Sequence, residues 1–215
     1  MIAKGLMHSK VLQCRTFFFA TVALLSMLCS PASGRTQENA GPTTGEALHY
    51  AVTYEWGPIY LEVGEVIFSA SQDSIAGAAE DWNFQGWGTS MPNWDWFYPV
   101  NSMYASTTDA TFIPKTFSRI GREGRHRYHR LYAATESGCV GLHCLDDELE
   151  NTSICPSDDG GEFRDVLSAI HWCRQLPWST YRRGDVIAMD LLLDGAVHST
   201  TWEFAGQVQY LALNW

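Results

Sequence analysis

Residues 48–56 read LHYAVTYEW, in which large apolar side chains alternate with polar or small ones. A period of two over these residues predicts a β-strand with one buried face, because successive side chains of a strand point to opposite sides. Gly57 and Pro58 then favour a turn. A second apolar stretch follows at residues 59–71, so the domain is expected to open with an antiparallel hairpin.

The same kind of pattern recurs along most of the chain. It predicts further strands at residues 80–88, 102–111, 115–121, 125–134, 186–193, 197–204 and 208–215. Asp194-Gly195, a pair typical of tight hairpins, joins two of them. The pattern therefore indicates a mainly β domain, built as a curved antiparallel sheet or a barrel-like sheet.

One segment has a helical period instead. Between residues 162 and 175, apolar side chains recur at the spacing of a helix face, at Phe163, Val166, Leu167, Ile170 and Cys173. We expect this helix to cover the sheet, with Leu167 and Ile170 in the core. His171 borders the apolar face, which favours a packed structural histidine over a catalytic one.

Two stretches are expected to lie outside the regular strands. The aromatic run NWDWFYPV at residues 93–100 is interpreted as a short turn or helix that plugs the core. Residues 138–161 are polar and acidic and hold three of the cysteines, which favours a loop pinned by disulfides. Within it, Asn151-Thr152-Ser153 is a glycosylation sequon that would matter only in a eukaryotic host.

The first 34 residues carry the features of a secretory signal peptide. Basic residues precede an apolar run at residues 16–28, and Ala32-Ser33-Gly34 offers small residues for cleavage after Gly34. The run is too short for a transmembrane helix, the first alternative. Leu28 before Cys29 disfavours a lipoprotein, the second. We therefore expect an exported protein, periplasmic or secreted, with no transmembrane segment in its mature chain.

The mature chain is expected to have a flexible N-terminus at residues 35–45 and a single β-rich domain at residues 46–215. Its end, LALNW at residues 211–215, reads as an apolar strand without a cap, which suggests truncation at the C-terminus. Without the leader, 11 basic and 24 acidic residues give a net charge of −13. Nucleic acid is therefore not an expected partner, because binding to phosphate needs Lys and Arg.

Four cysteines remain after removal of the leader, namely Cys139, Cys144, Cys155 and Cys173. An even number in an oxidising compartment favours two disulfides. Pairing of Cys139 with Cys144 and of Cys155 with Cys173 is one of three arrangements. Zinc is the alternative, with His143 and His171 nearby, but no C-x-x-C pair exists and the spacing matches no familiar zinc module. No metal and no cofactor are therefore expected.

Arginine is concentrated in one short segment. Five of the eleven basic residues of the mature chain fall within twelve positions, at Arg119, Arg122, Arg125, Arg127 and Arg130. Because the guanidinium group suits carboxylate and phosphate, the segment is a candidate anion-binding hairpin. Two alternatives are an edge hairpin kept charged against aggregation and internal pairing with the acidic residues Asp146, Asp147, Glu148 and Glu150.

Common catalytic signatures are missing from the sequence, including the nucleophile elbow, the zinc-protease motif and the phosphate-binding loops. Catalytic residues therefore stay unknown. Carboxylates that could pair as in a glycosidase are Glu62, Glu65, Asp95 and Asp109. Nine tryptophans indicate either an aromatic-lined ligand cavity or an ordinary aromatic core.

Three blocks of the chain carry a family resemblance. They comprise Gly45–Tyr50, Trp56-Gly57 and Gly64-Glu65; then Trp94–Tyr98, Tyr104–Ser106, Asp109, Pro114 and Arg122–Gly124; then Asp165–Ala169, Arg174, Gly184-Asp185 and Gly206. In order and spacing, these blocks resemble the bacterial exported family called "domain of unknown function 3108".

The resemblance implies an envelope protein of Gram-negative bacteria, built on a curved antiparallel sheet or barrel, with no known activity and no known catalytic residues. Asn101-Ser102 departs from the polar, often acidic, pair expected there, and the chain ends where the family has further strands. We therefore expect a non-catalytic binding or carrier module for an apolar or anionic envelope component. The alternatives are an envelope hydrolase with paired carboxylates and a structural partner in an envelope assembly, and the expected partner is a lipid, a glycan or a protein.

Overall fold

A computed structural model describes residues 41–206, except 57–58, 74–80, 137, 147 and 157–161. In chain order its elements are β1 (Glu46–Trp56), β2 (Ile59–Asp73), β3 (Asp81–Ser90), the 3-10 helix η1 (Pro92–Trp94), β4 (Val100–Thr108), β5 (Pro114–Glu123), β6 (His126–Thr135), β7 (Gly138–Leu145), β8 (Glu148–Pro156), β9 (Phe163–Arg164), α2 (Val166–Gln175), the 3-10 helix η2 (Trp178–Thr180), β10 (Val186–Leu193) and β11 (Ala196–Glu203). The expectation of a mainly β domain with one covering helix is confirmed.

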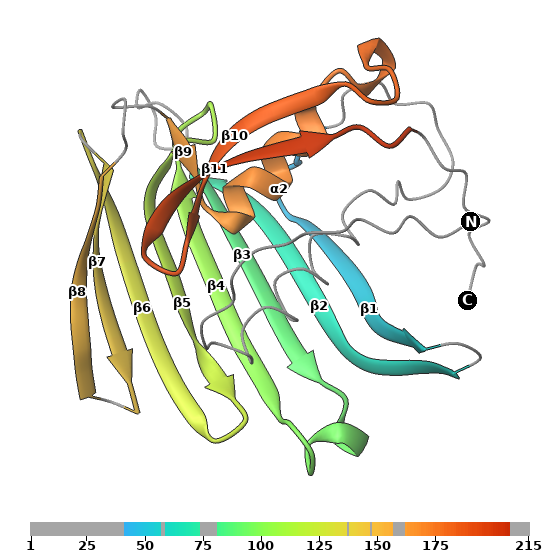
Figure 1. The fold of residues 1–215 in the computed structure, drawn as a ribbon, viewed down its shortest axis with the longest axis vertical. Coiled ribbons are helices and arrows are strands. Elements are labelled where there is room, and N and C mark those ends of the chain that lie inside the picture. The colour runs from blue at the N-terminus through green and yellow to red at the C-terminus, as the bar shows by residue number, and fades with distance from the viewer. Residues whose placement is uncertain are drawn as a thin grey trace, which may run out of the picture. The chain divides into compact units, whose positions relative to one another are not determined.

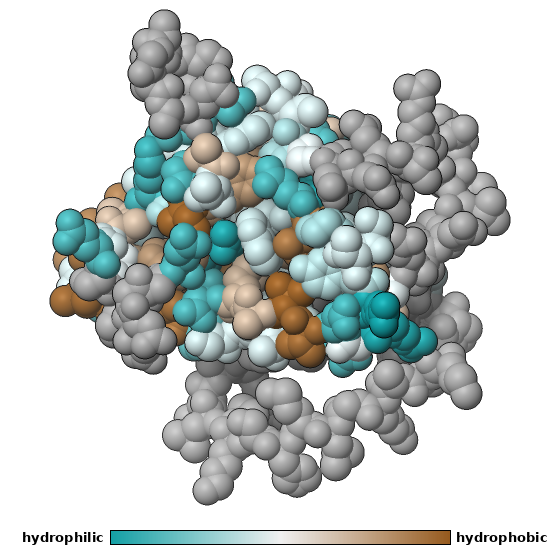
Figure 2. Space-filling view, turned by 90° about the horizontal axis from the view of Figure 1, so that it is seen from above, coloured by the Kyte–Doolittle hydropathy of each residue, from teal (hydrophilic) through white to brown (hydrophobic). Residues whose placement is uncertain are grey.

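Strands β1 to β8 form one antiparallel sheet in which each strand pairs with the next in the chain (Figure 1). This sheet is curved and open, so it is not a closed barrel. A smaller sheet has the order β11-β10-β9, in which β9 runs parallel to β10 and α2 makes the crossover between them. Figure 1 shows α2 and the smaller sheet over one end of the large sheet. Figure 2, viewed from that end, shows hydrophilic and hydrophobic side chains interspersed.

The two faces of the large sheet differ in what contacts them. A Cβ atom built on Gly86 would lie 3.0 Å from Cδ2 of Leu167, so the helix approaches the sheet where no side chain intervenes. Leu167 is 1% exposed and Ile170 is also buried, which confirms the predicted helix face. We call this side of the sheet the covered face. The opposite side carries Trp87, which is 50% exposed, and is called the outer face.

The helix begins later than the sequence predicts. Phe163 and Arg164 pair with Asp190 and Leu191 as strand β9 instead of joining the helix. Asp165 then caps the helix, and its carboxylate accepts hydrogen bonds from the backbone N–H groups of residues 167 and 168 at 2.8 and 3.0 Å. Burial raises the pKa of Asp165, while these hydrogen bonds and one from Ser106 oppose that shift.

The predicted loop at residues 138–161 is wrong, because most of it forms the hairpin β7–β8. Its alternation was hidden by the residue types. Cys139, Gly141 and His143 are buried and are small or polar, whereas Val140 and Leu142 are about half exposed on the outer face. A period of two was present in the sequence, but with the apolar side chains on the less buried side.

The interpretation of residues 93–100 as a core plug is also wrong. Trp96 and Phe97 are 80% and 74% exposed. They follow η1 in the connection between β3 and β4, at the end of the sheet away from α2 (Figure 1). The described covering elements, α2 and the smaller sheet, lie over the other end of the strands.

The expected strand at residues 208–215 and the leader at residues 1–34 lie outside the described residues. Within the part of the chain that the structure describes, no helix is long and apolar enough to cross a membrane.

Candidate functional site

The five clustered arginines lie on the β5–β6 hairpin, which divides them among three places. The register pairs Arg119 with Arg130 and Arg122 with Arg127. Arg119 and Arg130 lie on the covered face. Arg122 and Arg127 lie on the outer face, because each is an odd number of residues away from the other arginine on its strand and successive side chains point to opposite sides. Arg125 lies in the turn and is exposed.

On the covered face, Arg119 forms an ion pair with Glu123 at 2.5 Å. The two side chains are only 11% and 10% exposed. Glu123 also accepts a hydrogen bond from the hydroxyl of Tyr128 at 2.7 Å, and that hydroxyl lies 2.6 Å from Oγ of Ser102. The guanidinium of Arg119 lies 4.4 Å from the centroid of the Tyr128 ring. This arrangement is a buried network that stabilises the hairpin against β4.

The pKa values of both Tyr128 and Arg119 are raised in this network, for different reasons. Burial raises the pKa of Tyr128, which keeps its hydroxyl protonated as a donor to Glu123. Burial alone would lower the pKa of Arg119, but the oxygen groups around it, including Glu123, raise it above its ordinary value. Arg119 therefore stays charged, and its charge is balanced inside the fold.

Arg130 connects the two sheets. Its guanidinium pairs with the carboxylate of Asp194, in the turn between β10 and β11, and Nη1 of Arg119 lies 3.7 Å from the same carboxylate. On the covered face, Arg119 and Arg130 thus form ion pairs with carboxylates of the chain itself, those of Glu123 and Asp194.

Arg122 and Arg127 belong to a row of polar residues that crosses the outer face. Register neighbours across β3, β4, β5 and β6 are Thr89, Asn101, Arg122 and Arg127. The next row along the strands is more apolar and consists of Trp87, Met103, Ile120, His129 and Cys144. Nε1 of Trp87 donates to Oδ1 of Asn101 at 2.9 Å, which joins the two rows.

Apart from Trp87, the residues of the two rows line a hollow of about 640 Å³, within the size range of small-molecule sites. Its lining comprises Thr89, Asp95, Pro99, Val100, Asn101, Met103, Ile120, Gly121, Arg122, Arg127, Tyr128, His129 and Cys144. We call it the outer hollow. It combines an apolar floor at Met103 and Ile120, which are 46% and 41% exposed, with two guanidinium groups at one side.

Neither guanidinium of the outer hollow forms an ion pair with a described carboxylate. Nε of Arg122 donates to the carbonyl oxygen of Gly124 at 3.1 Å, which orients that side chain. Asp146 does contact the hairpin, but it accepts from the backbone N–H of Arg127 at 2.8 Å and lies 3.1 Å from Nδ1 of His126. These contacts lower the pKa of Asp146, the first cause being the bond from the Arg127 backbone.

The other acidic residues that the sequence offered as partners of the arginines form no ion pair with Arg122 or Arg127 among the described residues. Glu148 and Glu150 are exposed, and Asp147 lies outside the described residues. Inside the outer hollow, Asp95 accepts a hydrogen bond from Oγ of Ser90 at 2.5 Å. The charged side chains lining the hollow are therefore two arginines and one aspartate.

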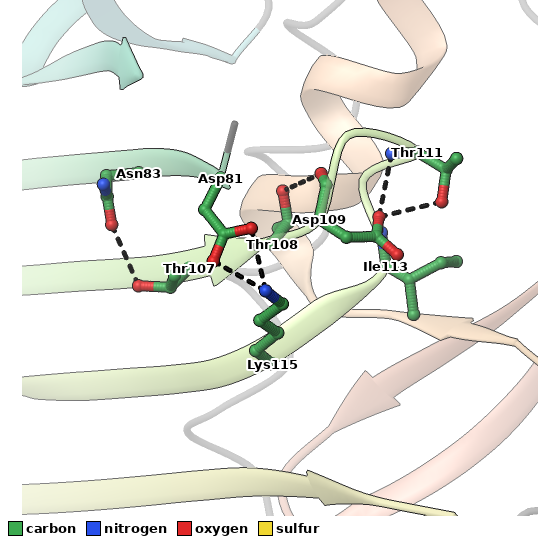
Figure 3. Close-up of polar contacts among 8 residues, drawn as sticks. All are labelled: Asp81, Asn83, Thr107, Thr108, Asp109, Thr111, Ile113 and Lys115. Atoms are coloured by element: carbon green, nitrogen blue, oxygen red, sulfur yellow. Dashed lines mark hydrogen bonds and ion pairs between the residues drawn. The ribbon is translucent and has the colours of Figure 1, made fainter. Parts of the chain in front are cut away.

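Among the candidate carboxylates for hydrolysis, Glu65 lies opposite Thr89 at the same end of the sheet as Asp95, whereas Asp109 lies at the other end. Asp95 precedes β4 and Asp109 follows it, so roughly 25 to 30 Å of strand separates them. Paired catalytic carboxylates lie within about 9.5 Å of each other. Figure 3 shows that Asp109 serves its own loop, where it accepts from Thr111 at 2.8 Å and from the N–H of Ile113 at 3.0 Å. Glu62 and Glu65 are exposed on β2.

The predicted bridge between Cys139 and Cys144 is wrong. Both residues lie on β7, where five steps of an extended strand span about 16 Å. A disulfide needs Cα atoms closer than about 7 Å. Cys144 has a free thiol and lines the outer hollow. The β7–β8 register instead places Cys139 opposite Cys155.

The two histidines considered as zinc ligands are packed in the fold. Nε2 of His143 lies 2.9 Å from Oγ of Ser153, and burial lowers the pKa of His143. The ring of His171 stacks on Phe84 with centroids 4.1 Å apart, and burial followed by the nearby Arg174 lowers its pKa to about 3. The expectation that His171 is structural is consistent with this packing. Within the described ranges, no group of three His, Cys, Asp or Glu residues could hold a metal ion.

Comparison of the chain with protein families, with curated proteins and with solved structures finds no match. The resemblance to the exported bacterial family therefore stays a prediction.

The sequence did not single out Met103 and Ile120, the apolar floor of the outer hollow. The strand expected at residues 115–121 ends before Arg122, whereas β5 continues to Glu123 and so places Ile120 and Arg122 on one side of a strand. Their meeting with Met103 and Arg127 depends on the registers of three strands, which the alternation does not determine.

Proposed function

We propose that this chain is an exported, non-catalytic binding protein whose outer hollow holds a molecule with an anionic group next to an apolar part. A lipid of the cell envelope has this chemistry. Export is supported by the charged leader, the short apolar run and the cleavage pattern in residues 1–34.

The observation that carries the proposal is the juxtaposition of Arg122 and Arg127. They are direct cross-strand neighbours, and like charges in such positions repel each other. Without a described carboxylate between them, an anion from outside would relieve this repulsion and accept hydrogen bonds from both guanidinium groups. Met103 and Ile120 lie in the adjacent row, so an apolar extension of the same molecule would meet an apolar surface.

We expect the double substitution Arg122→Gln and Arg127→Gln to weaken binding of a short-chain phosphatidylglycerol by about tenfold to a hundredfold. The reason is that a hydrogen bond to a charged group contributes about 1.5 to 3 kcal/mol, and about 1.4 kcal/mol corresponds to a factor of ten. Isothermal titration calorimetry of the lipid below its micelle concentration measures the effect. The free energy of unfolding should change by less than about 1 kcal/mol, because both side chains are exposed.

A matched control is available in Arg182 and Arg183, which are exposed in the segment before β10. Changing both to Gln removes the same charge from another part of the molecule and should leave the affinity unchanged. Equal losses in the two double variants would mean general electrostatic attraction rather than a site. Inorganic phosphate serves as a second probe: Ile120→Ser should weaken the lipid and leave phosphate binding as it is.

We also propose that Cys139 and Cys155 form a disulfide across the edge hairpin, with the mature chain beginning at residue 35. The cross-strand register supports the pairing, and the exported context favours oxidation. Peptide mapping of the protein isolated from its host should recover these two cysteines in one linked peptide, with Cys144 open to alkylation. A linked peptide containing Cys144, or an N-terminus at Cys29, would contradict this proposal.

A further inference from the structure

The connection between β3 and β4 projects two aromatic rings from the same end of the sheet as the outer hollow. Trp96 and Phe97 are 80% and 74% exposed, and their rings meet edge to face with centroids 5.8 Å apart. We call these two residues the aromatic tip. Single exposed apolar side chains are common on protein surfaces, but an adjacent pair of large rings at this exposure is a concentrated apolar feature.

The aromatic tip is held in place by its neighbours. Nε1 of Trp94 donates to the carbonyl oxygen of Glu62 at 3.0 Å, and the N–H groups of Phe97 and Tyr98 donate to the carbonyl oxygen of Trp94 at 2.9 and 3.1 Å. Asp95 is bonded to Ser90 on β3. These contacts fix the backbone of the turn, which lowers the entropy that docking would cost.

The arginine hairpin is joined directly to this turn. The N–H of Gly124 donates to the carbonyl oxygen of Pro99 at 2.8 Å. A Cβ atom at Gly124 would lie 2.8 Å from Cε2 of Tyr98, and Gly124 has a φ of 62°, so glycine fits this contact both sterically and conformationally. Arg125 follows in the same turn and is exposed. The turn that carries Arg125 is thus joined by a backbone hydrogen bond to the connection that carries the aromatic tip.

We propose that the aromatic tip and Arg125 dock this protein onto the surface of a bilayer that contains anionic lipid. Tryptophan and phenylalanine bury their rings at the boundary between lipid headgroups and acyl chains. Arginine close to the headgroups is attracted by anionic lipid. Without its leader the chain has a formal net charge of −13, so a local cationic site is what allows an approach to such a surface.

The shape of the feature favours a bilayer over a protein partner. The rings protrude from a narrow turn, and a fluid interface accepts protruding side chains without a matching pocket. The acidic turn between β7 and β8 limits the approach, because Asp146 there carries a negative charge and contacts His126 and the backbone of Arg127. Docking therefore takes place over the β3–β6 part of the edge. Asp95, Pro99 and Val100 belong to the outer hollow, so a docked molecule would hold the hollow close to the lipid.

The test is cosedimentation of the mature protein, purified from its own host, with vesicles of phosphatidylglycerol and phosphatidylcholine. Changing Trp96 and Phe97 together to Ser should weaken partitioning by about tenfold or more, given the apolar area that two aromatic rings bury. Arg125→Gln should weaken it by about fivefold. Exchanging the rings, Trp96→Phe with Phe97→Trp, should retain binding within about twofold.

Ile154 supplies the matched control because it is also 80% exposed and lies near the opposite end of the sheet, on β8. Ile154→Ser should partition like the unchanged protein. The proposal is overturned if the Ser variants of the aromatic tip bind vesicles normally, if Ile154→Ser loses as much, or if vesicles of phosphatidylcholine alone capture the protein equally well. Capture of the protein by another envelope protein, with no partitioning onto vesicles, would also overturn it.

Docking onto a bilayer and binding of a ligand in the outer hollow can be tested independently of each other. The short-chain lipid reports on the outer hollow in the absence of a bilayer, and the tip variants should bind it normally. Arg122→Gln with Arg127→Gln should lose the short-chain lipid while the aromatic tip still brings the protein to vesicles, with partitioning reduced only by the missing charge.

Discussion

Replacing Glu123 with glutamine is expected to lower the free energy of unfolding by about 3 kcal/mol, because it leaves the charge of a buried arginine without its closest counter-ion. Arg119 and Glu123 are 11% and 10% exposed and meet at 2.5 Å. Glutamine keeps an oxygen that can accept from Tyr128, so the substitution mainly removes the charge. Asp194 at 3.7 Å from Arg119 compensates in part, which places the expected cost at the lower end for a broken buried pair.

Urea unfolding at neutral pH measures this cost, and the pair Lys115–Asp81 provides its control. That ion pair has a similar length, 2.6 Å, but its side chains are 52% and 27% exposed. It lies on strands β3 and β5 (Figure 3). Asp81→Asn is the same chemical change and should cost no more than about 1 kcal/mol. If Glu123→Gln costs as little as Asp81→Asn, the charge of Arg119 is balanced by other groups and the network is not what stabilises the hairpin.

The concentration of arginines is visible in the sequence, but the carboxylates that pair with them are not. Alternation in residues 125–134 separates Arg127 from Arg130 onto opposite sides of a strand. The carboxylate partners of Arg119 and Arg130, by contrast, do not follow from alternation. Asp194 is 64 positions away from Arg130, and only the return of the β10–β11 turn to the covered face brings the two together.

Strands with apolar residues on their buried side could be predicted, and strands with small or polar residues there could not. Residues 48–56 have large apolar side chains at every second position and were assigned correctly. In β7, the buried positions at Cys139 and Gly141 carry little apolar surface, and the sequence read as a loop. Tertiary packing against the β10–β11 turn decides this segment, since a Cβ atom on Gly195 would lie 2.8 Å from the ring of His143.

The outer hollow could not be predicted from the sequence for a similar reason. Each of its rows is made of residues from different strands that are neighbours only through the register of the sheet. A shift by one residue in β5 would move Arg122 to the covered face and destroy the site. Prediction of single residues was therefore feasible for the arginines, whereas their apolar neighbours required the fold.

Replacing Leu167 with alanine is expected to lower the free energy of unfolding by about 2 to 5 kcal/mol. The side chain is 1% exposed and its Cδ2 faces Gly86 on β3. Because glycine has no side chain that could move into the space, the cavity left by the substitution would stay open, which favours the upper part of this range. Chemical denaturation measures the loss.

Leu149→Ala makes the same chemical change at a side chain that is 64% exposed on β8, and it should cost less than about 0.5 kcal/mol. Equal costs at the two positions would mean that α2 does not clamp the sheet. Leu167 lies on the covered face and the outer hollow on the other, so Leu167→Ala should destabilise the fold yet leave the affinity for short-chain phosphatidylglycerol unchanged under native conditions. Loss of both properties together would place the ligand against the helix instead, since only a site that shares the Gly86 contact would respond to this cavity.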